Sequence, residues 1–163
     1  MSNISVIGAG GWGLALANIF SEKHNIKVWV HSEKSYKLLN ENHRNDNYLK
    51  NIELNKNIFF TMDIKEVVND SEIIIIVTPS FAFHEACENI EPYIKNEQIL
   101  ISATKGLDRK TGKTMSEVAR SVISGDLNIL TLSGPSHAEE TAKGIPTAIV
   151  VGGEIGMWET IRN

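Results

Sequence analysis

The sequence predicts an α/β fold in which a doubly wound, mostly parallel sheet carries helices on both faces. Short runs rich in Ile and Val recur along the chain, and helix-like stretches separate several of them. Nearly continuous apolar runs are typical of strands buried on both faces of a parallel sheet. Alternation of such strands with helices is typical of doubly wound proteins. A glycine-rich turn between the first expected strand and the first expected helix supports the same architecture.

The individual elements follow from these patterns. We expect strands at residues 4–7, 27–30, 58–60, 73–77, 99–102, 129–132 and 148–151. We expect helices at residues 11–23, 33–41, 81–94, 114–122 and 136–143. Residues 42–57 are polar and rich in Asn, which predicts a long loop. Long ordered loops in compact domains are often functional, and a plain surface excursion fits the composition equally well.

The glycine-rich turn reads G-A-G-G-W-G at residues 8–13 and matches G-x-G-x-x-G. In the dinucleotide-binding form of this motif, the first glycine makes a tight turn and the second lets a pyrophosphate approach the backbone. The third lets a helix pack closely on the sheet. Gly8, Gly10 and Gly13 take these roles, and the N-terminus of the next helix offers free N–H groups to phosphates. The motif predicts a Rossmann-type domain with a dinucleotide ligand.

Composition narrows the function further. The chain has 163 residues, of which 42% are hydrophobic, enough for the core of one domain. Its net charge of -4 argues against a nucleic-acid partner, which needs basic excess. The lone Cys87 cannot form an internal disulfide, which favours a reducing, cytoplasmic location, and its apolar neighbours favour a buried thiol. No apolar segment approaches the roughly 20 residues of a membrane span, and the scattered histidines predict no metal site.

The end of the second expected strand bears on the choice of nicotinamide cofactor. An Asp or Glu about 20 residues beyond the glycines holds the ribose of NAD in this fold, whereas His31 occupies the strand end here. His31 and Lys34 can partly neutralise a 2′-phosphate, so NADP tolerance is favoured. Glu33 can still serve NAD, and both basic side chains could equally be solvated loop residues.

Three later strand ends also carry polar residues, and open α/β sheets bind ligands at that edge. Ser80 is expected to cap a helix that begins at Phe81. The ammonium of Lys105 precedes a glycine turn and is placed to meet an anion, although most lysines are simply solvated. Ser136 and Glu139 have the spacing of a capping box, and the N–H groups at that helix start offer a second phosphate site.

Three segments together carry a resemblance to a known family. They are Gly8-Ala9-Gly10-Gly11-Trp12-Gly13, Ala103-Thr104-Lys105-Gly106-Leu107 and Ser133-Gly134-Pro135-Ser136-His137-Ala138-Glu139-Glu140. In this order and spacing they resemble the bacterial-type NAD(P)-dependent glycerol-3-phosphate dehydrogenase. Val77-Thr78-Pro79-Ser80 and Gly144-Ile145-Pro146-Thr147-Ala148 fit as well, so the resemblance covers nearly the whole chain.

The resemblance implies interconversion of dihydroxyacetone phosphate and sn-glycerol 3-phosphate with NAD(P)H, a step that supplies the backbone of phospholipids. It implies cofactor contacts at Gly11, Trp12 and His31, a weaker one at Tyr48 in the Asn-rich loop, and a further one at Ala138. The substrate is then a small phosphorylated triose.

The resemblance also implies a substrate site. Lys105 corresponds to a lysine that contacts both substrate and cofactor, and Gly134 and Ser136 correspond to substrate-binding positions. This agrees with the anion-binding groups expected at the ends of the fifth and sixth strands.

Two departures from the family pattern stand out. The family often has Ser where this chain has Gly11, so one hydroxyl near the cofactor is missing and backbone N–H groups would serve instead. The family's Tyr-Leu-Pro…Leu-Pro pattern is present as Tyr48-Leu49-Lys50…Leu54-Asn55, without either proline. This predicts a more mobile loop around Tyr48.

The sequence also suggests how the protein is divided. We assign residues 1–153 to a dinucleotide-binding domain and interpret residues 154–163 as the start of a linker or helix towards a C-terminal helical domain absent from this chain. The family's proton-transferring lysine lies in such a domain, within a segment resembling Gly-Gly-Ala-Val-Lys-Asn, so we assign no catalytic residue here.

Two other functions remain as alternatives at this point. One is a stand-alone dinucleotide-sensing module, and the other is a β-hydroxyacid or ketopantoate reductase of the same architecture. Association into a homo-oligomer is also consistent with the sequence, because a domain without its second half would expose apolar surface.

Overall fold

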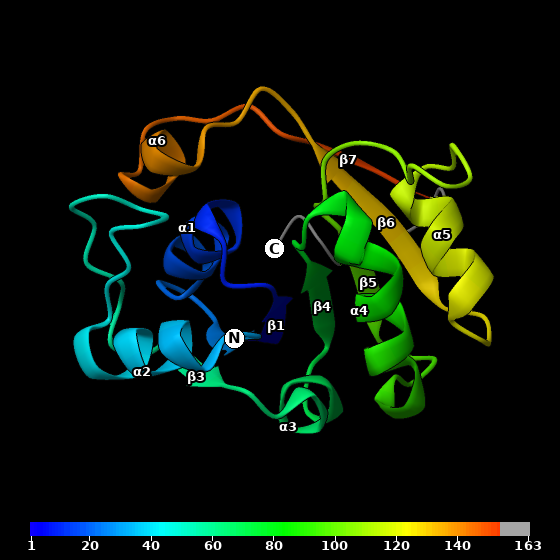
Figure 1. The fold of residues 1–163 in the computed structure, drawn as a ribbon, viewed down its shortest axis with the longest axis horizontal. Helices are drawn as coiled ribbons and strands as arrows, with labels where there is room; N and C mark the ends of the chain where they lie inside the picture. Colours follow the sequence, from blue (N-terminus) through cyan, green and yellow to red (C-terminus); the bar gives the residue numbers. More distant parts are fainter. Residues whose placement is uncertain (154–163) are drawn as a thin grey trace.

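A seven-stranded sheet runs through residues 1–153, which are the residues that this computed structural model describes (Figure 1). The strands lie in the order β3-β2-β1-β4-β5-β6-β7. They are β1 (Asn3–Ile7), β2 (Asn25–Trp29), β3 (Phe59–Thr61), β4 (Ile73–Ile76), β5 (Ile99–Ser102), β6 (Asn128–Ser133) and β7 (Val150–Gly152). All neighbouring pairs are parallel except β6 and β7. The doubly wound, mostly parallel architecture is therefore confirmed, and the element expected at residues 154–163 lies outside the described residues.

Helices cover both faces of the sheet (Figure 1). They are α1 (Gly11–Phe20), α2 (Glu33–Asn42), α3 (Ile64–Asn69), α4 (Phe83–Ile90), α5 (Met115–Val122) and α6 (Ala138–Ala142), with the short 3-10 turns η1 (Ser80–Ala82) and η2 (Glu91–Tyr93). Helix α1 packs beside α6, and α4 packs beside α5. The strand order shows that the chain runs outward from β1 through β2 to β3, returns to the centre at β4, and runs outward on the other side through β5 and β6. The winding direction therefore reverses between β1 and β4.

The two faces of the sheet have separate apolar cores. Val6 and Ile75 point into the core shared with α1, α2 and α6. Ile7 and Ile74 point into the core shared with α3, α4 and α5. This alternation is what the two-residue period of a strand dictates. It explains why apolar residues in these strands occupy consecutive positions, as in Val6-Ile7 and Ile73–Ile76, instead of every second one.

Two expected helix caps are wrong. Ser80 does not cap a helix at Phe81, because residues 80–82 form the turn η1 and α4 begins two residues later without a side-chain cap. The capping box expected at Ser136 is absent as well. His137 is the N-cap of α6, and the Ser136 hydroxyl donates instead to the carbonyl of Gly134. In both cases a turn follows the strand, so the helix begins two or more residues after the serine.

A helix and a capping box were missed. Helix α3 is only six residues long, too short for apolar periodicity to reveal it, and Asp63 caps it by accepting from two backbone N–H groups. The capping box lies at α5. There the Thr114 side chain accepts from the Glu117 N–H, and the Glu117 carboxylate accepts from the Thr114 N–H at 2.8 Å.

The Asn-rich segment 43–57 is a loop, as expected, and it is fixed to the body by its own residues. Leu49, Ile52 and Leu54 are buried in the core next to α1 and α2. Arg44 forms an ion pair with Asp46 at 2.9 Å. The loop therefore has apolar anchors in the core and a charged contact within itself, and the greater mobility expected around Tyr48 stays a prediction.

Candidate functional site

The glycine turn lies where the winding direction reverses, at the carboxyl ends of β1 and β4. Gly8 has φ 122°, and a side chain there would lie 2.8 Å from the carbonyl oxygen of Val77. A side chain at Gly13 would overlap the carbonyl of Gly8, whereas the space beside Gly10 is open. The three glycines therefore have distinct roles: a turn, an open approach to the backbone, and close packing of a helix on the sheet. The first turn of α1 contains no acidic residue, so no carboxylate of that turn neutralises the positive end of the helix or competes with a bound phosphate.

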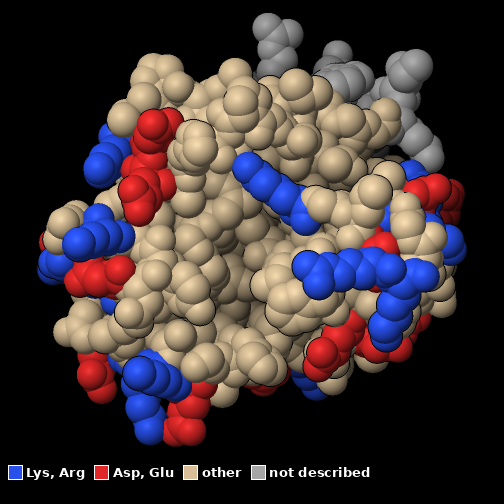
Figure 2. Space-filling model, turned by 45° about the horizontal axis from the view of Figure 1, so that its top comes forward, with Lys and Arg blue, Asp and Glu red and all other residues tan. Residues whose placement is uncertain are grey.

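A hollow of about 400 Å³ extends from the glycine turn along the carboxyl edge of the sheet. One wall is formed by the end of β2 and the start of α2, and the other by the end of β4 and by α4. The lining residues include Gly8, Gly10, His31, Ser35, Tyr48, Thr78, Phe81, Glu85 and Asn89. Figure 2 shows this face of the molecule, with a hollowed centre that is largely uncharged and with charged side chains mainly around it.

A second cluster forms on the other side of the α1 N-terminus. The Lys105 ammonium donates to the Ser136 carbonyl at 3.1 Å and lies 5.9 Å from the centre of the Trp12 ring. A cation within about 6 Å of an indole face is attracted to it. Lys105 therefore joins helix α1 to the segment that follows β6, although the two are distant in sequence.

Gly11 brings the Asn-rich loop and α6 to the same place. A side chain at Gly11 would lie 3.0 Å from the Tyr48 carbonyl oxygen and 3.7 Å from the Ala138 side chain. Tyr48 itself is half exposed and also lines the hollow. The absence of a side chain at position 11 therefore lets the loop approach the helix, which a serine would hinder.

The end of β6 also depends on a glycine. Gly134 has φ 149°, and a side chain there would lie 2.6 Å from the Ala148 carbonyl oxygen. Ser136 is buried. The segment before β7 thus passes directly over this turn, which sets the position of the Ser136 carbonyl that receives Lys105.

The structure therefore gathers the predicted residues into two adjoining groups. Gly8, Gly10, His31 and Tyr48 line the hollow. Gly11, Trp12, Lys105, Ser136 and Ala138 meet beside it, and Tyr48 touches both groups. Gly13 and Gly134 support the two turns and do not line the hollow.

Sequence reasoning missed Phe81, Glu85 and Asn89 as lining residues, whereas Thr78 lies in a segment that the resemblance already included. Phe81 is 77% exposed and lines the hollow, as do Glu85 and Asn89. The Thr78 hydroxyl is buried without a hydrogen-bond partner in the described residues and lines the same space. The signal was present, because Glu85 and Asn89 are four residues apart and so lie on one helix face.

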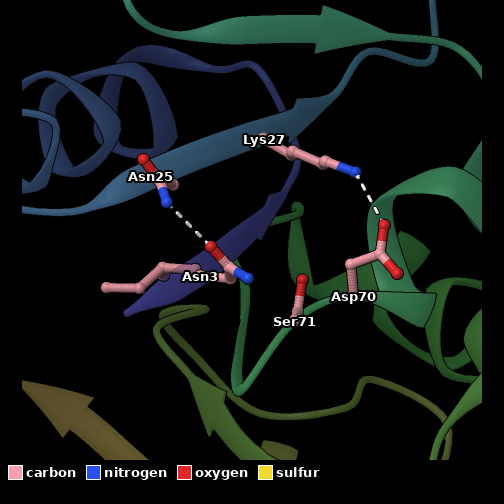
Figure 3. Close-up of a pocket in the computed structure, with 6 residues that line it drawn as sticks. Asn3, Asn25, Lys27, Asp70 and Ser71 are labelled. Atoms are coloured by element: carbon pink, nitrogen blue, oxygen red, sulfur yellow. Dashed lines mark hydrogen bonds and ion pairs between the residues drawn. The ribbon is translucent and has the colours of Figure 1, made fainter. Parts of the chain in front are cut away.

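A second hollow, of about 540 Å³, lies at the opposite edge of the sheet (Figure 3). Its polar side chains bond to one another or to the backbone. Asn25 donates to Asn3 at 2.9 Å, Lys27 pairs with Asp70 at 3.2 Å, and the Ser71 hydroxyl donates to the Val67 carbonyl. Each of these side chains thus makes at least one bond that helps to hold the ends of the strands.

Other site types find no support in residues 1–153. No group of three or more His, Cys, Asp or Glu side chains there could hold a metal ion. Burial raises the pKa of the Cys87 thiol to about 12, so this cysteine is an inert core residue, as expected. Within the same range, none of the helices has the length and apolar character that crossing a membrane requires.

A parallel sheet with a glycine turn at its point of reversal, opening on a hollow at the carboxyl edge, defines a Rossmann-type dinucleotide-binding domain. The particular family follows from comparison with known sequences. The family model described as "NAD-dependent glycerol-3-phosphate dehydrogenase N-terminus" matches residues 3–156. The chain belongs to this family, and the resemblance noted from its motifs is confirmed.

Individual relatives agree with the family. The chain is 78% identical over its whole length to a glycerol-3-phosphate dehydrogenase [NAD(P)+] of Brachyspira hyodysenteriae, of which it covers 49%. It is 39% identical over 153 residues to the enzyme of the same name from Fusobacterium nucleatum, covering 93% of this chain and 46% of that one. The crystal structure of glycerol-3-phosphate dehydrogenase from Coxiella burnetii superimposes with a TM-score of 0.89 at 28% identity, over 98% of this chain and 49% of that one. The chain thus spans about half the length of these relatives.

Proposed function

We propose that this chain is the cofactor-binding half of an oxidoreductase that interconverts dihydroxyacetone phosphate and sn-glycerol 3-phosphate by hydride transfer with NAD(P)H. The single observation that carries the proposal is the position of Lys105. Its ammonium lies between the Trp12 ring on the cofactor-binding helix and the Ser136 carbonyl after β6. A cation between these two elements can contact a nicotinamide dinucleotide and an anionic substrate together.

The cofactor would extend across both groups of residues. Its pyrophosphate fits the open space beside Gly10, at the unopposed positive end of α1. Its adenosine half would follow the hollow towards His31, and its nicotinamide half would lie towards Trp12 and Lys105. Gly11, Tyr48 and Ala138 would border the cofactor between these ends, with Gly8 and Gly13 holding the backbone in place.

Tolerance of NADP receives support from the end of β2. His31 is exposed at the hollow, and Lys34 is exposed in the first turn of α2. Glu33 is paired with Lys37 at 2.8 Å, which offsets the charge that would otherwise repel a 2′-phosphate. We therefore expect both NADH and NADPH to bind.

The substrate would be a small phosphorylated triose. Lys105, Ser136 and the turn at Gly134 would surround its anionic group. Hydride addition to a ketone carbon leaves an oxyanion that must be protonated by an acid within hydrogen-bond reach. We assign that acid to the part of the relatives that this chain does not match. Residues 1–153 would then be the dinucleotide-binding domain, with residues 154–163 leading to a helical domain.

The cellular role follows from the proposed reaction. Glycerol 3-phosphate is the backbone of glycerophospholipids, so the enzyme would act in lipid synthesis. The single, buried cysteine fits a cytoplasmic location. Assembly into a homo-oligomer is part of the same proposal and is testable by light scattering.

The experiment is a titration of the chain with NADH and with NADPH, followed by nicotinamide fluorescence. We expect saturable binding of both, weakened about tenfold by Lys105→Ala because a charged contact is lost. Lys110→Ala is the matched control, since it removes an equal charge from the exposed part of the same loop, and it should leave binding within about twofold. Equal weakening by both substitutions would mean that Lys105 acts only through its charge and makes no direct contact with the cofactor. Absence of binding by the unmodified chain would overturn the proposal.

The second arm of this experiment measures turnover. With dihydroxyacetone phosphate and NADPH, the chain alone should turn over poorly or not at all, because the proton donor is expected elsewhere. Full steady-state activity from residues 1–163 would contradict that assignment while leaving the cofactor site standing.

A further inference from the structure

Helix α4 presents two polar side chains to the hollow without using either of them in the fold. Glu85 and Asn89 are exposed, and both line the hollow. Within residues 1–153, no hydrogen bond or ion pair engages either side chain. The opposite face of α4 carries Phe83, Cys87 and Ile90, which are buried in the core. The helix is therefore fixed by one face, and its other face is free to meet a ligand.

The position of these residues along the hollow indicates which part of a dinucleotide they face. The pyrophosphate of a bound dinucleotide lies at the α1 N-terminus, beside Gly10, and the adenosine ribose lies at the end of β2, beside His31. The adenine is attached to that ribose, so it occupies the space between the end of β2 and α4. Glu85 and Asn89 line this space.

The walls of this space suit a flat aromatic base. Val77, Phe81, Ala82 and Ala86 supply apolar surface to the hollow between the polar groups. The faces of adenine are apolar, whereas its edge carries an exocyclic amine that must find an acceptor. Glu85 is the acidic residue among those that line the hollow.

We propose that Glu85 accepts a hydrogen bond from the exocyclic amine of the cofactor's adenine, with Asn89 as a neighbouring polar partner, and so selects adenine over bases with a carbonyl at that position. This inference rests on the proposed function, because it requires a dinucleotide in the hollow. A carboxylate only accepts hydrogen bonds, and hydrogen bonds to an ionised acceptor are stronger than neutral ones. A carbonyl oxygen in place of the amine would face the carboxylate oxygens and be repelled.

The test compares NADH with deamino-NADH, in which hypoxanthine replaces adenine and the fluorescent nicotinamide is unchanged. We expect the chain to bind NADH about tenfold more tightly than deamino-NADH. In Glu85→Ala this ratio should fall to about twofold or less, because NADH loses its hydrogen bond and deamino-NADH loses the repulsion. In Glu85→Gln the amide can donate to the carbonyl of hypoxanthine, so deamino-NADH should bind more tightly than it does to the unmodified chain.

Glu88→Ala is the matched control. Glu88 lies on the same helix, faces His84 at 3.5 Å and does not line the hollow, so its removal should leave the ratio near tenfold. Equal affinities of the unmodified chain for both dinucleotides, or a ratio that Glu85→Ala does not change, would overturn the inference and leave the proposed function intact. Failure of both dinucleotides to bind would overturn the proposed function, and the inference with it.

Discussion

The two edges of the sheet differ in what their polar groups do. At the amino edge, the side chains around the hollow pair with one another or with the backbone, as Lys27 does with Asp70. At the carboxyl edge, Glu85 and Asn89 have no partner in the described residues, and the Thr78 hydroxyl is buried and unpaired. A buried polar group without a partner, such as the Thr78 hydroxyl, costs stability, whereas the exposed Glu85 and Asn89 keep bonds to water that a ligand can replace. The carboxyl edge therefore offers to a ligand the kind of polar group that the amino edge uses within the fold.

Volume alone does not distinguish the two hollows, which measure about 540 Å³ at the amino edge and about 400 Å³ at the carboxyl edge. Only the hollow at the carboxyl edge adjoins a helix N-terminus and a glycine turn with open space beside it. We therefore expect changes at the amino edge to alter stability and changes at the carboxyl edge to alter binding, with one instructive exception.

The largest expected effect is that exception. Gly13→Ala lies at the carboxyl edge but should destabilise the fold by about 3 kcal/mol, because the added methyl overlaps the Gly8 carbonyl and neither backbone can move without disturbing the packing of α1 on β1. Denaturant unfolding monitored by circular dichroism measures the change. A loss below about 1 kcal/mol would mean that α1 can slide on the sheet, contrary to the close packing described here.

Gly10→Ala is the matched control for this substitution. The space beside Gly10 is open, so the free energy of unfolding should change by less than about 0.5 kcal/mol. Binding of NADH should weaken at least about tenfold, since the methyl occupies the path of the pyrophosphate. If Gly10→Ala bound NADH normally, the pyrophosphate would have to lie elsewhere.

The next largest effect is a loss of stability at the amino edge of the sheet. Gln98 is buried, and its amide donates to the carbonyls of Val68 and Ser71 at 2.8 and 2.6 Å. Gln98→Ala leaves both carbonyls without this donor and should cost about 2 kcal/mol of stability. The dissociation constant for NADH, measured below the unfolding transition, should not change. A change in binding would show that the two edges of the sheet are coupled.

The smallest effect concerns the loop that carries Tyr48. The Arg44 guanidinium and the Asn51 N–H both donate to the Asp46 carboxylate and hold its pKa below the usual range. A carboxyl group whose pKa is lower in the folded state stabilises that state fully above its unfolded pKa. This contribution is lost as the pH falls through the folded value.

An NMR titration of the Asn51 amide shift measures this pKa directly. We expect a midpoint below that of an ordinary aspartate, and a flat profile in Asp46→Asn. The exposed position of Asp46 predicts a small change in overall stability. A midpoint at or above the usual aspartate value would mean that the ion pair does not hold the loop in solution.

Much of the fold could be predicted because its signals are local. Runs of Ile and Val mark strands buried on two faces, and the six parallel strands were found within a few residues of their true ends. The roles of Gly8, Gly10 and Gly13 also follow from one short motif, since a positive φ and a missing side chain are properties of single positions. Helix α3 was missed because six residues give too little periodicity.

For the candidate site, the sequence indicated several of the residues but not the contacts that they make. Lys105 and Ser136 were chosen from their strand ends, and the structure then brought them within a hydrogen bond of each other. The caps at Ser80 and Ser136 were wrong because each serine lies in a turn that the strand end imposes. The antiparallel pairing of β7 also could not be foreseen, because apolar composition does not encode strand direction.

The sequence by itself determined the alternation of strands and helices and the dinucleotide motif, because each depends on residues close together in the chain. It also determined the family, through three short segments in a fixed order and spacing. The tertiary structure alone decided which polar groups remain without partners. Whether Glu85 meets a cation, a backbone donor or open space depends on where the fold places α4 relative to the end of β2, some fifty residues away in the sequence. That placement leaves Glu85 at the hollow, whereas the arrangement of the elements at the amino edge brings Lys27 to Asp70.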